Sequence, residues 1–250
     1  MVCEEDYVYK KTENRRGDGR LLFSAAVAVM ICVAVFVFAS LGGTGVKIIL
    51  SAEEIHAVCF GEFESEASAL RNAAVLRQRG GAGYVYLDKK YFVLAVGFRE
   101  SKDAQSVAAK SAASNETAGV IKLASPKAVI NFEGTAKQGA AVKRMLDLFP
   151  LTFDGISELS LSLDRGLLTQ NDVFAGINVF VQNAENALAE LKDLADFSTV
   201  RTAAGGLAAL IGILLDLKTS RQDSADLKRC AFCIFFAYKS FKEHASGLAH

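Results

Sequence analysis

Two stretches of this 250-residue chain repeat each other, 36 positions apart. Residues 57–87 return without a gap as residues 93–123. The matched positions are Gly61 with Gly97, Glu64-Ser65 with Glu100-Ser101, Ala73 with Ala109, Ala82-Gly83 with Ala118-Gly119, and Leu87 with Leu123. Two units are too few for a solenoid, so the repeat predicts one pseudo-symmetric domain.

Each copy of the repeat has the pattern strand, helix, strand. Four short runs rich in apolar, β-branched or aromatic residues predict the strands: 56–60, 84–87, 92–96 and 120–123. Ser65 and Ser101 are suited to begin the intervening helices, because their hydroxyls can accept from free first-turn amides. Gly61 and Gly97 predict tight turns from strand to helix. Two copies give β-α-β-β-α-β, a split βαβ sandwich with two helices on one face of a sheet.

A run of 21 residues, 21–41, contains neither charge nor proline. A helix of that length spans roughly 30 Å, the thickness of the hydrocarbon core of a bilayer. Lysine and arginine are concentrated in the preceding segment, 1–20, so the run predicts a single transmembrane helix with a cytoplasmic N-terminus. A cleaved signal peptide is the alternative. In either case the rest of the chain is expected outside the cytoplasm, after a linker over 42–53.

Composition excludes several kinds of partner and site. The chain has 28 basic and 28 acidic residues, which gives no indication of nucleic-acid binding. Cys230 and Cys233 form a C-x-x-C in an apolar helical stretch without a second pair or a nearby histidine, which indicates buried thiols rather than a zinc or redox site. We therefore expect neither a metal nor a cofactor.

The glycines of the repeat lie within runs that resemble a known family. Residues 58–65 read VCFGEFES before an alanine-rich helix, and residues 92–98 read FVLAVGF. With this spacing, residues 54–125 resemble the SPOR domain, a bacterial peptidoglycan-binding module. The sequence departs from the family where Cys59 and Ala95 replace a glutamine and an arginine, and where the proline of the second turn is missing.

The resemblance implies that glycan strands bind the open face of the sheet, away from the helices. Strand side chains alternate between faces. If Val58, Phe60, Phe92, Leu94 and Val96 face the helices, the open face carries Ala57, Cys59, Tyr91, Val93 and Ala95. Tyr84 and Tyr86 would add hydrogen-bonding groups if they share it. The candidate glycan-binding residues are Cys59, Tyr84, Tyr86, Tyr91, Val93 and Ala95.

This expected open face has few polar groups, and an apolar face is typical of a surface that a partner covers. An alternative is therefore a decayed SPOR fold whose sheet packs on the C-terminal helices or on a protein partner.

Residues 135–250 predict a bundle of four or five helices. The clearest follows Thr169, which can form a capping box with Asp172. Its apolar seam consists of Val173, Ile177, Phe180, Ala184, Ala187, Leu191 and Leu194. Pro150 is expected to stop a helix that contains Val142 and Phe149. Leucine and serine alternate over 159–163, so a strand is an alternative to a helix there. Residues 203–215 carry no charge and predict a buried central helix, with a membrane-associated helix as the alternative.

Catalysis finds little support in the residue types present. The three histidines, His56, His244 and His250, do not provide the two histidines and a carboxylate of a zinc amidase. The carboxylates of 185–196 are expected on the solvent side of a helix. No nucleophile or phosphate-loop motif occurs.

We therefore expect an α+β, non-catalytic, single-pass bacterial membrane protein. Its extracytoplasmic SPOR-like domain would bind peptidoglycan at a division or sporulation septum, and its C-terminal helices could contact a protein partner. The alternative is the structural or interaction protein with the decayed fold.

Overall fold

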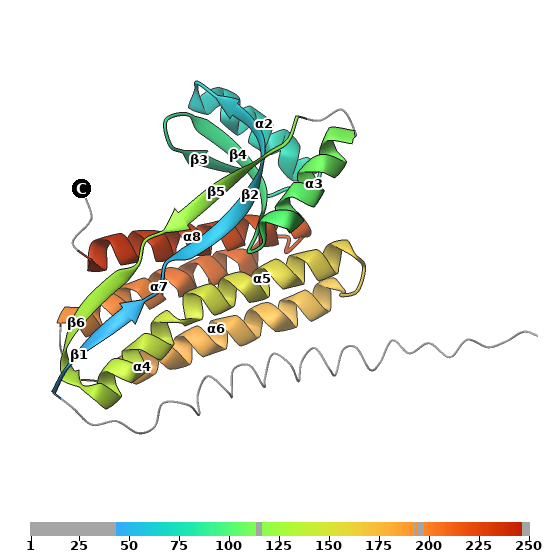
Figure 1. The fold of residues 1–250 in the computed structure, drawn as a ribbon. Coiled ribbons are helices and arrows are strands. Elements are labelled where there is room, and N and C mark those ends of the chain that lie inside the picture. Colours follow the sequence, from blue (N-terminus) through green and yellow to red (C-terminus); the bar gives the residue numbers. More distant parts are fainter. Residues whose placement is uncertain (1–43, 114–116, 193, 195–197, 247–250) are drawn as a thin grey trace, which may run out of the picture. The chain divides into compact units, whose positions relative to one another are not determined.

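The computed structural model describes residues 44–113, 117–192, 194 and 198–246, which form a mixed α+β structure with two small sheets (Figure 1). The α+β class is as predicted. The basic tail, 1–20, and the transmembrane helix predicted over 21–41 lie outside the described residues.

The repeat forms its elements in the predicted order. These are β2 (Glu53–Phe63), α2 (Glu66–Gln78), β3 (Tyr84–Leu87), β4 (Tyr91–Phe98), α3 (Ser101–Ala113) and β5 (Gly119–Ser125). The strands form one antiparallel sheet in the order β3-β4-β2-β5. The Ser65 hydroxyl accepts from the amide of Ser68 at 3.4 Å and so caps α2, as predicted.

Both helices of the repeat pack on one face of this sheet through alanine side chains. Ala69 and Ala73 of α2 and Ala104 and Ala108 of α3 form one buried cluster with sheet residues such as Val93. Because alanine side chains are small, the two helices can lie close to the strands. Within each pair the alanines are four residues apart, about one helical turn, so they lie on the same face of their helix.

An irregularity in the β2–β4 pairing changes the predicted faces of β4. Val58 pairs with Val96, whereas the next residue, Cys59, pairs with Leu94, so Ala95 is an extra residue in β4. An extra residue inverts the alternation on one side of it. Accordingly, Val96 faces the helices as predicted, but so do Ala95, Val93 and Tyr91. Phe92 and Leu94 face the opposite way. Of the six residues 91–96, the predicted face is therefore correct only at Val96 and wrong at the other five.

Gly61 and Gly97 lie within strands, so the prediction of strand-to-helix turns at these positions is wrong. Gly61 has a φ of +114° and lies at a second irregularity of β2, between the residues that pair with Leu94 and Phe92. A side chain at Gly97 would meet Phe232: its Cβ would be 3.3 Å from the Phe232 Cε1 atom. Glycine inside a strand typically marks a bulge or a close approach, and the two positions illustrate both cases.

A second, two-stranded sheet was not predicted. Strand β1 (Thr44–Leu50) lies in the segment predicted as a linker and pairs antiparallel with β6 (Ala128–Thr135). Residues of β6 alternate between buried and exposed. The buried side chains of β6, including Phe132, lie on the face of this sheet that contacts α4 (Ala136–Leu146).

The C-terminal region forms helices, as predicted. After α4 come α5 (Leu148–Asp164), α6 (Gln170–Lys192), α7 (Ser198–Thr219) and α8 (Ser224–Ala245). In the bundle, α5 and α7 each contact both α6 and α8. The capping box at the start of α6 is confirmed: the Thr169 amide donates to Asp172 Oδ2 at 2.8 Å, and the Asp172 amide donates to Thr169 Oγ1 at 3.3 Å. The α6 seam is buried at Val173, Ile177, Ala184, Ala187 and Leu191.

Two predictions about α4 and α5 are wrong in detail. Helix α4 ends at Leu146, and Pro150 lies in the first turn of α5, where its missing amide costs no intrahelical hydrogen bond. The alternating residues 159–163 belong to α5, so they do not form a strand.

Residues 203–215 are predicted to form a buried helix, and the helix that contains them, α7, is buried along one face only. Its buried residues are Val200, Ala203, Leu207, Leu210, Leu214 and Leu217. Leu215, on the other face, is 41 % exposed. Among the described helices, α7 is long and apolar enough to span a bilayer, and a third of that stretch is buried; core helices of soluble proteins also meet this criterion.

We expect Gly97→Val to lower the free energy of unfolding by about 1–3 kcal/mol, because the new methyl groups must displace Phe232. Gly119→Val is the matched control. It also lies in a strand of the sheet, but a Cβ there has no neighbour within 4 Å, and stability should be unchanged or slightly higher. Urea unfolding of the full chain in mild detergent, followed by circular dichroism, measures both. Equal effects of the two variants would contradict the close approach.

Candidate functional site

Helix α8 contacts the sheet of the repeat on the face opposite α2 and α3. The Tyr84 and Phe236 rings stack with centroids 5.2 Å apart and an interplanar angle of 8°. Tyr86 stacks on the same Phe236 ring at 5.1 Å and 20°. Tyr84 also lies 5.5 Å from the Phe232 ring. The face on which the resemblance places glycan binding is therefore in contact with aromatic side chains of the chain's own C-terminal region.

The six candidate residues do not form one surface. Val93 and Ala95 are buried beneath α2 and α3, and Tyr91 packs against the same cluster. Tyr84 and Tyr86 contact α8. Cys59 pairs with Leu94, is 7 % exposed and donates its thiol hydrogen to the Gly61 carbonyl at 3.1 Å. Burial raises the pKa of the Cys59 thiol, so it is an uncharged, inert group.

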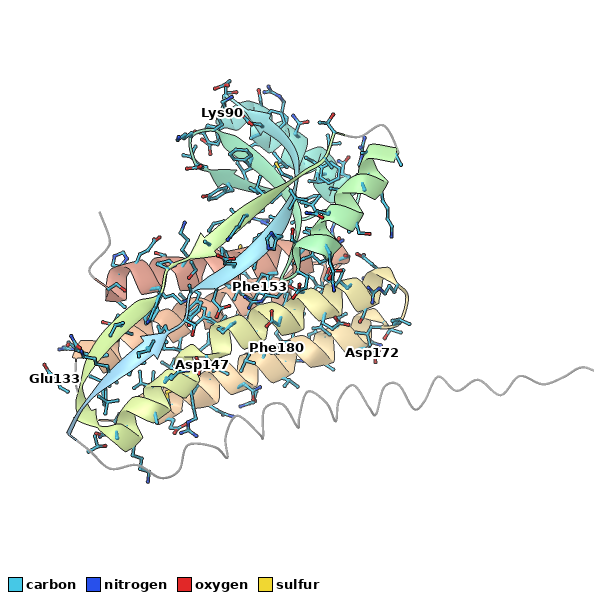
Figure 2. The ribbon with its side chains drawn as sticks, in the orientation of Figure 1. Lys90, Glu133, Asp147, Phe153, Asp172 and Phe180 are labelled. Atoms are coloured by element: carbon cyan, nitrogen blue, oxygen red, sulfur yellow. The ribbon has the colours of Figure 1, made fainter. Side chains whose placement is uncertain are left out.

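Charged groups join the sheet to the bundle beside these aromatic stacks. Arg99, which follows β4, donates to Glu53 at 2.6 Å and to Asp154 of α5 at 2.7 Å. Its guanidinium carbon lies 4.9 Å from the centre of the Phe153 ring. Figure 2 shows Phe153 on the part of α5 next to the strands. One arginine thus connects β2, β4 and α5.

Two lysines of α8 hold both ends of this helix against the repeat and its flanking loops. The Lys228 Nζ atom donates to the Gly80 carbonyl at 2.8 Å and pairs with Asp164 at 2.8 Å. Lys242 is fully buried; its Nζ donates to the Ser51 carbonyl at 2.6 Å and lies 4.1 Å from the centre of the Tyr238 ring. Desolvation lowers the pKa of Lys242 to about 8, against the opposing effect of Glu53.

Sequence reasoning missed this role of Lys242, although a signal was available. Ala231, Phe235, Tyr238 and Lys242 are spaced by four, three and four residues, so they share one face of a helix, and all four are buried. A lysine that continues an apolar helical face is a candidate for burial, whereas the composition of the segment alone indicates a solvated charge.

A hollow of about 450 Å³ lies along β3, between α2 and α8. Tyr84 and Tyr91 line it, so it brings together two of the six candidates. Arg77 of α2 and Arg229 of α8 also line it, together with aliphatic side chains that include Leu87. Glu66 and Cys233 line it as well, and burial raises the pKa of the Cys233 thiol, so this thiol is not an activated nucleophile. The rings, aliphatic groups and guanidinium groups are suited to binding.

The described residues contain no group of three or more His, Cys, Asp or Glu side chains that could hold a metal ion. No protein-family model, curated protein or solved structure matches the chain.

We expect Lys242 to make the free energy of unfolding rise with pH between about 8 and 10, because the unfolded chain binds its proton over a range in which the folded chain releases it. Burial raises the pKa values of the Cys59, Cys230 and Cys233 thiols, which has the opposite effect from about pH 9 upward, so the Lys242 contribution is read as the difference in slope between wild type and Lys242→Met. The slope has a limit of about 1.4 kcal/mol per pH unit. The slope of Lys242→Met should be lower than that of the wild type by up to this amount. Burial also raises the pKa of Tyr84 to about 12; its opposite effect falls mainly above pH 10 and is the same in wild type and variant.

Urea midpoints at pH 7.5, 8.5 and 9.5 measure this slope. Lys239→Met is the matched control on α8, since Lys239 is half-buried and contacts Glu243 instead of the sheet, and it should keep the wild-type slope. An unchanged slope in Lys242→Met would contradict the assignment.

Proposed function

We propose that this protein is a non-catalytic structural and interaction protein of the bacterial cell envelope. In this proposal a SPOR-like split βαβ sandwich supports the C-terminal bundle instead of holding glycan strands. The strand order β3-β4-β2-β5, with α2 and α3 on one face, agrees with a split sandwich and supports the resemblance. A membrane anchor over 21–41 would hold the described domains outside the cytoplasm.

The observation that carries the proposal is the stacking of Tyr84 and Tyr86 on Phe236. Recognition of a sugar by an aromatic side chain requires access to the face of the ring. Here two of the three candidate tyrosines use a ring face for contact with α8. Glycan binding at this face would require α8 to detach, and each aromatic pair lost would cost about 0.5–1.5 kcal/mol beyond the buried area.

The charged contacts of α8 add to this cost. Detachment would leave Lys242 without the Ser51 carbonyl and Lys228 without the Gly80 carbonyl. It would also expose Phe232, which is fully buried. These contacts support a permanent cover rather than a removable one.

A partner for the bundle is supported by the outer face of α7. Residues Gly205, Ala208, Ala209, Gly212 and Leu215 are exposed on it. A contiguous apolar face of this kind is typical of a surface that contacts another protein. The interaction role therefore falls to surfaces other than the covered sheet.

We expect the full chain, solubilised in mild detergent, to remain in the supernatant when purified peptidoglycan sacculi are sedimented. The reason is that Tyr84 and Tyr86 are covered by Phe236. Immunoblotting of pellet and supernatant, with an unrelated membrane protein as the reference, measures the distribution.

If the wild-type chain does sediment with the sacculi, two tyrosine variants identify the face of the sheet that binds them. Tyr86→Ala alters the side that contacts α8, and Tyr91→Ala alters the side that contacts α2 and α3. Retention that only Tyr86→Ala abolishes would overturn the proposal in favour of glycan binding by the sheet.

A further inference from the structure

Strand β3 is an edge strand of the four-stranded sheet. It pairs with β4 on one side, and no strand among the described residues pairs with its other side. An edge of this kind presents backbone donors and acceptors that can pair with an added strand. At four residues β3 is short, so backbone pairing alone offers little affinity or selectivity, and side chains beside the edge must supply both.

The hollow of about 450 Å³ lies beside this edge and has a wall on each face of the sheet. Val85 belongs to the cluster beneath the helices, so the odd-numbered residues of β3 face α2, whereas Tyr84 faces α8. Leu70 and Arg77 of α2 form one wall, and Arg229 and Cys233 of α8 form the other. A strand added next to β3 would direct alternate side chains to these two walls.

The charge of the walls indicates the chemistry of that strand. Each wall carries one arginine, and neither Arg77 nor Arg229 forms an ion pair within the described part of the chain. The positive charge of Arg229 opposes the rise in pKa that burial causes at the Tyr84 phenol and the Cys233 thiol. Both of these groups line the hollow with Arg229. Glu66 is the carboxylate among the lining residues, so the lining has an excess of positive charge.

We propose that the β3 edge binds an extended acidic peptide segment of a partner protein, which adds a strand to the sheet. Its carboxylates contact Arg77 and Arg229, and its apolar side chains contact Leu70 and the Tyr84 ring. A second copy of this chain is a poor occupant, because two such edges would bring four guanidinium groups together. The inference names the partner of the interaction role proposed above and rests on it.

A random heptapeptide display library, panned against the full chain in mild detergent, tests this inference. We expect selected peptides to alternate acidic and apolar residues. Binding of a selected peptide should weaken about tenfold or more in the double variant Arg77→Gln/Arg229→Gln. The control, Arg71→Gln/Lys239→Gln, removes one positive charge from each of the same two helices outside the hollow and should bind as wild type does.

A charge reversal makes the test independent of folding defects. Panning against Arg77→Glu/Arg229→Glu should select basic peptides, which a misfolded protein would not do specifically. Bound acidic peptide should also slow amide hydrogen exchange at 84–87. Selection without acidic enrichment, equal weakening in the control, or protection confined to other strands would each overturn the inference. The sacculus experiment reads glycan binding, so the two proposals can fail separately.

Discussion

Helix α8 is the element on which the described part of the chain depends, because it belongs to two cores at once. One side packs on α5 and α7 of the bundle, and the other contacts β4, β5 and β6. Phe236 stacks on the sheet, while Tyr238 stacks on Phe149 of α5 with centroids 5.0 Å apart. Since one helix completes both hydrophobic cores, the sandwich and the bundle are expected to unfold together rather than as separate domains.

The departures from the SPOR pattern agree with this arrangement. Cys59 stands where the family has glutamine, and it lies buried on the strand face that meets α8. Ala95 stands where the family has arginine, and the bulge turns it beneath the helices. A long polar side chain at either position would be buried without a partner, which is costly. In the proposed SPOR-like fold, the apolar residues at positions 59 and 95 and the cover by α8 thus have one physical explanation.

Sequence reasoning succeeded where the signal is local and failed where it depends on distant residues. The order of the repeat, the caps at Ser65 and Thr169, and most of the α6 seam follow from neighbouring residues and are confirmed. Phe180 of the predicted seam is half-buried, and Leu194 lies beyond the end of α6. The bulge at Ala95 depends on pairing with β2, and β1 depends on a strand far along the chain, so alternation alone could not predict either. The hollow joins Arg77 and Arg229, which come from the repeat and the bundle, and no local pattern connects them.

The position of α8 in the chain has a consequence for biogenesis. Every other described element precedes it. During synthesis, the strand face with Tyr84 and Tyr86 therefore emerges before Phe236 is available to cover it. Until that moment the nascent chain displays an aromatic sheet to chaperones and proteases. A premature stop codon before α8 would consequently expose the earlier-synthesised sheet to quality control, although the sequence of the sheet itself is intact.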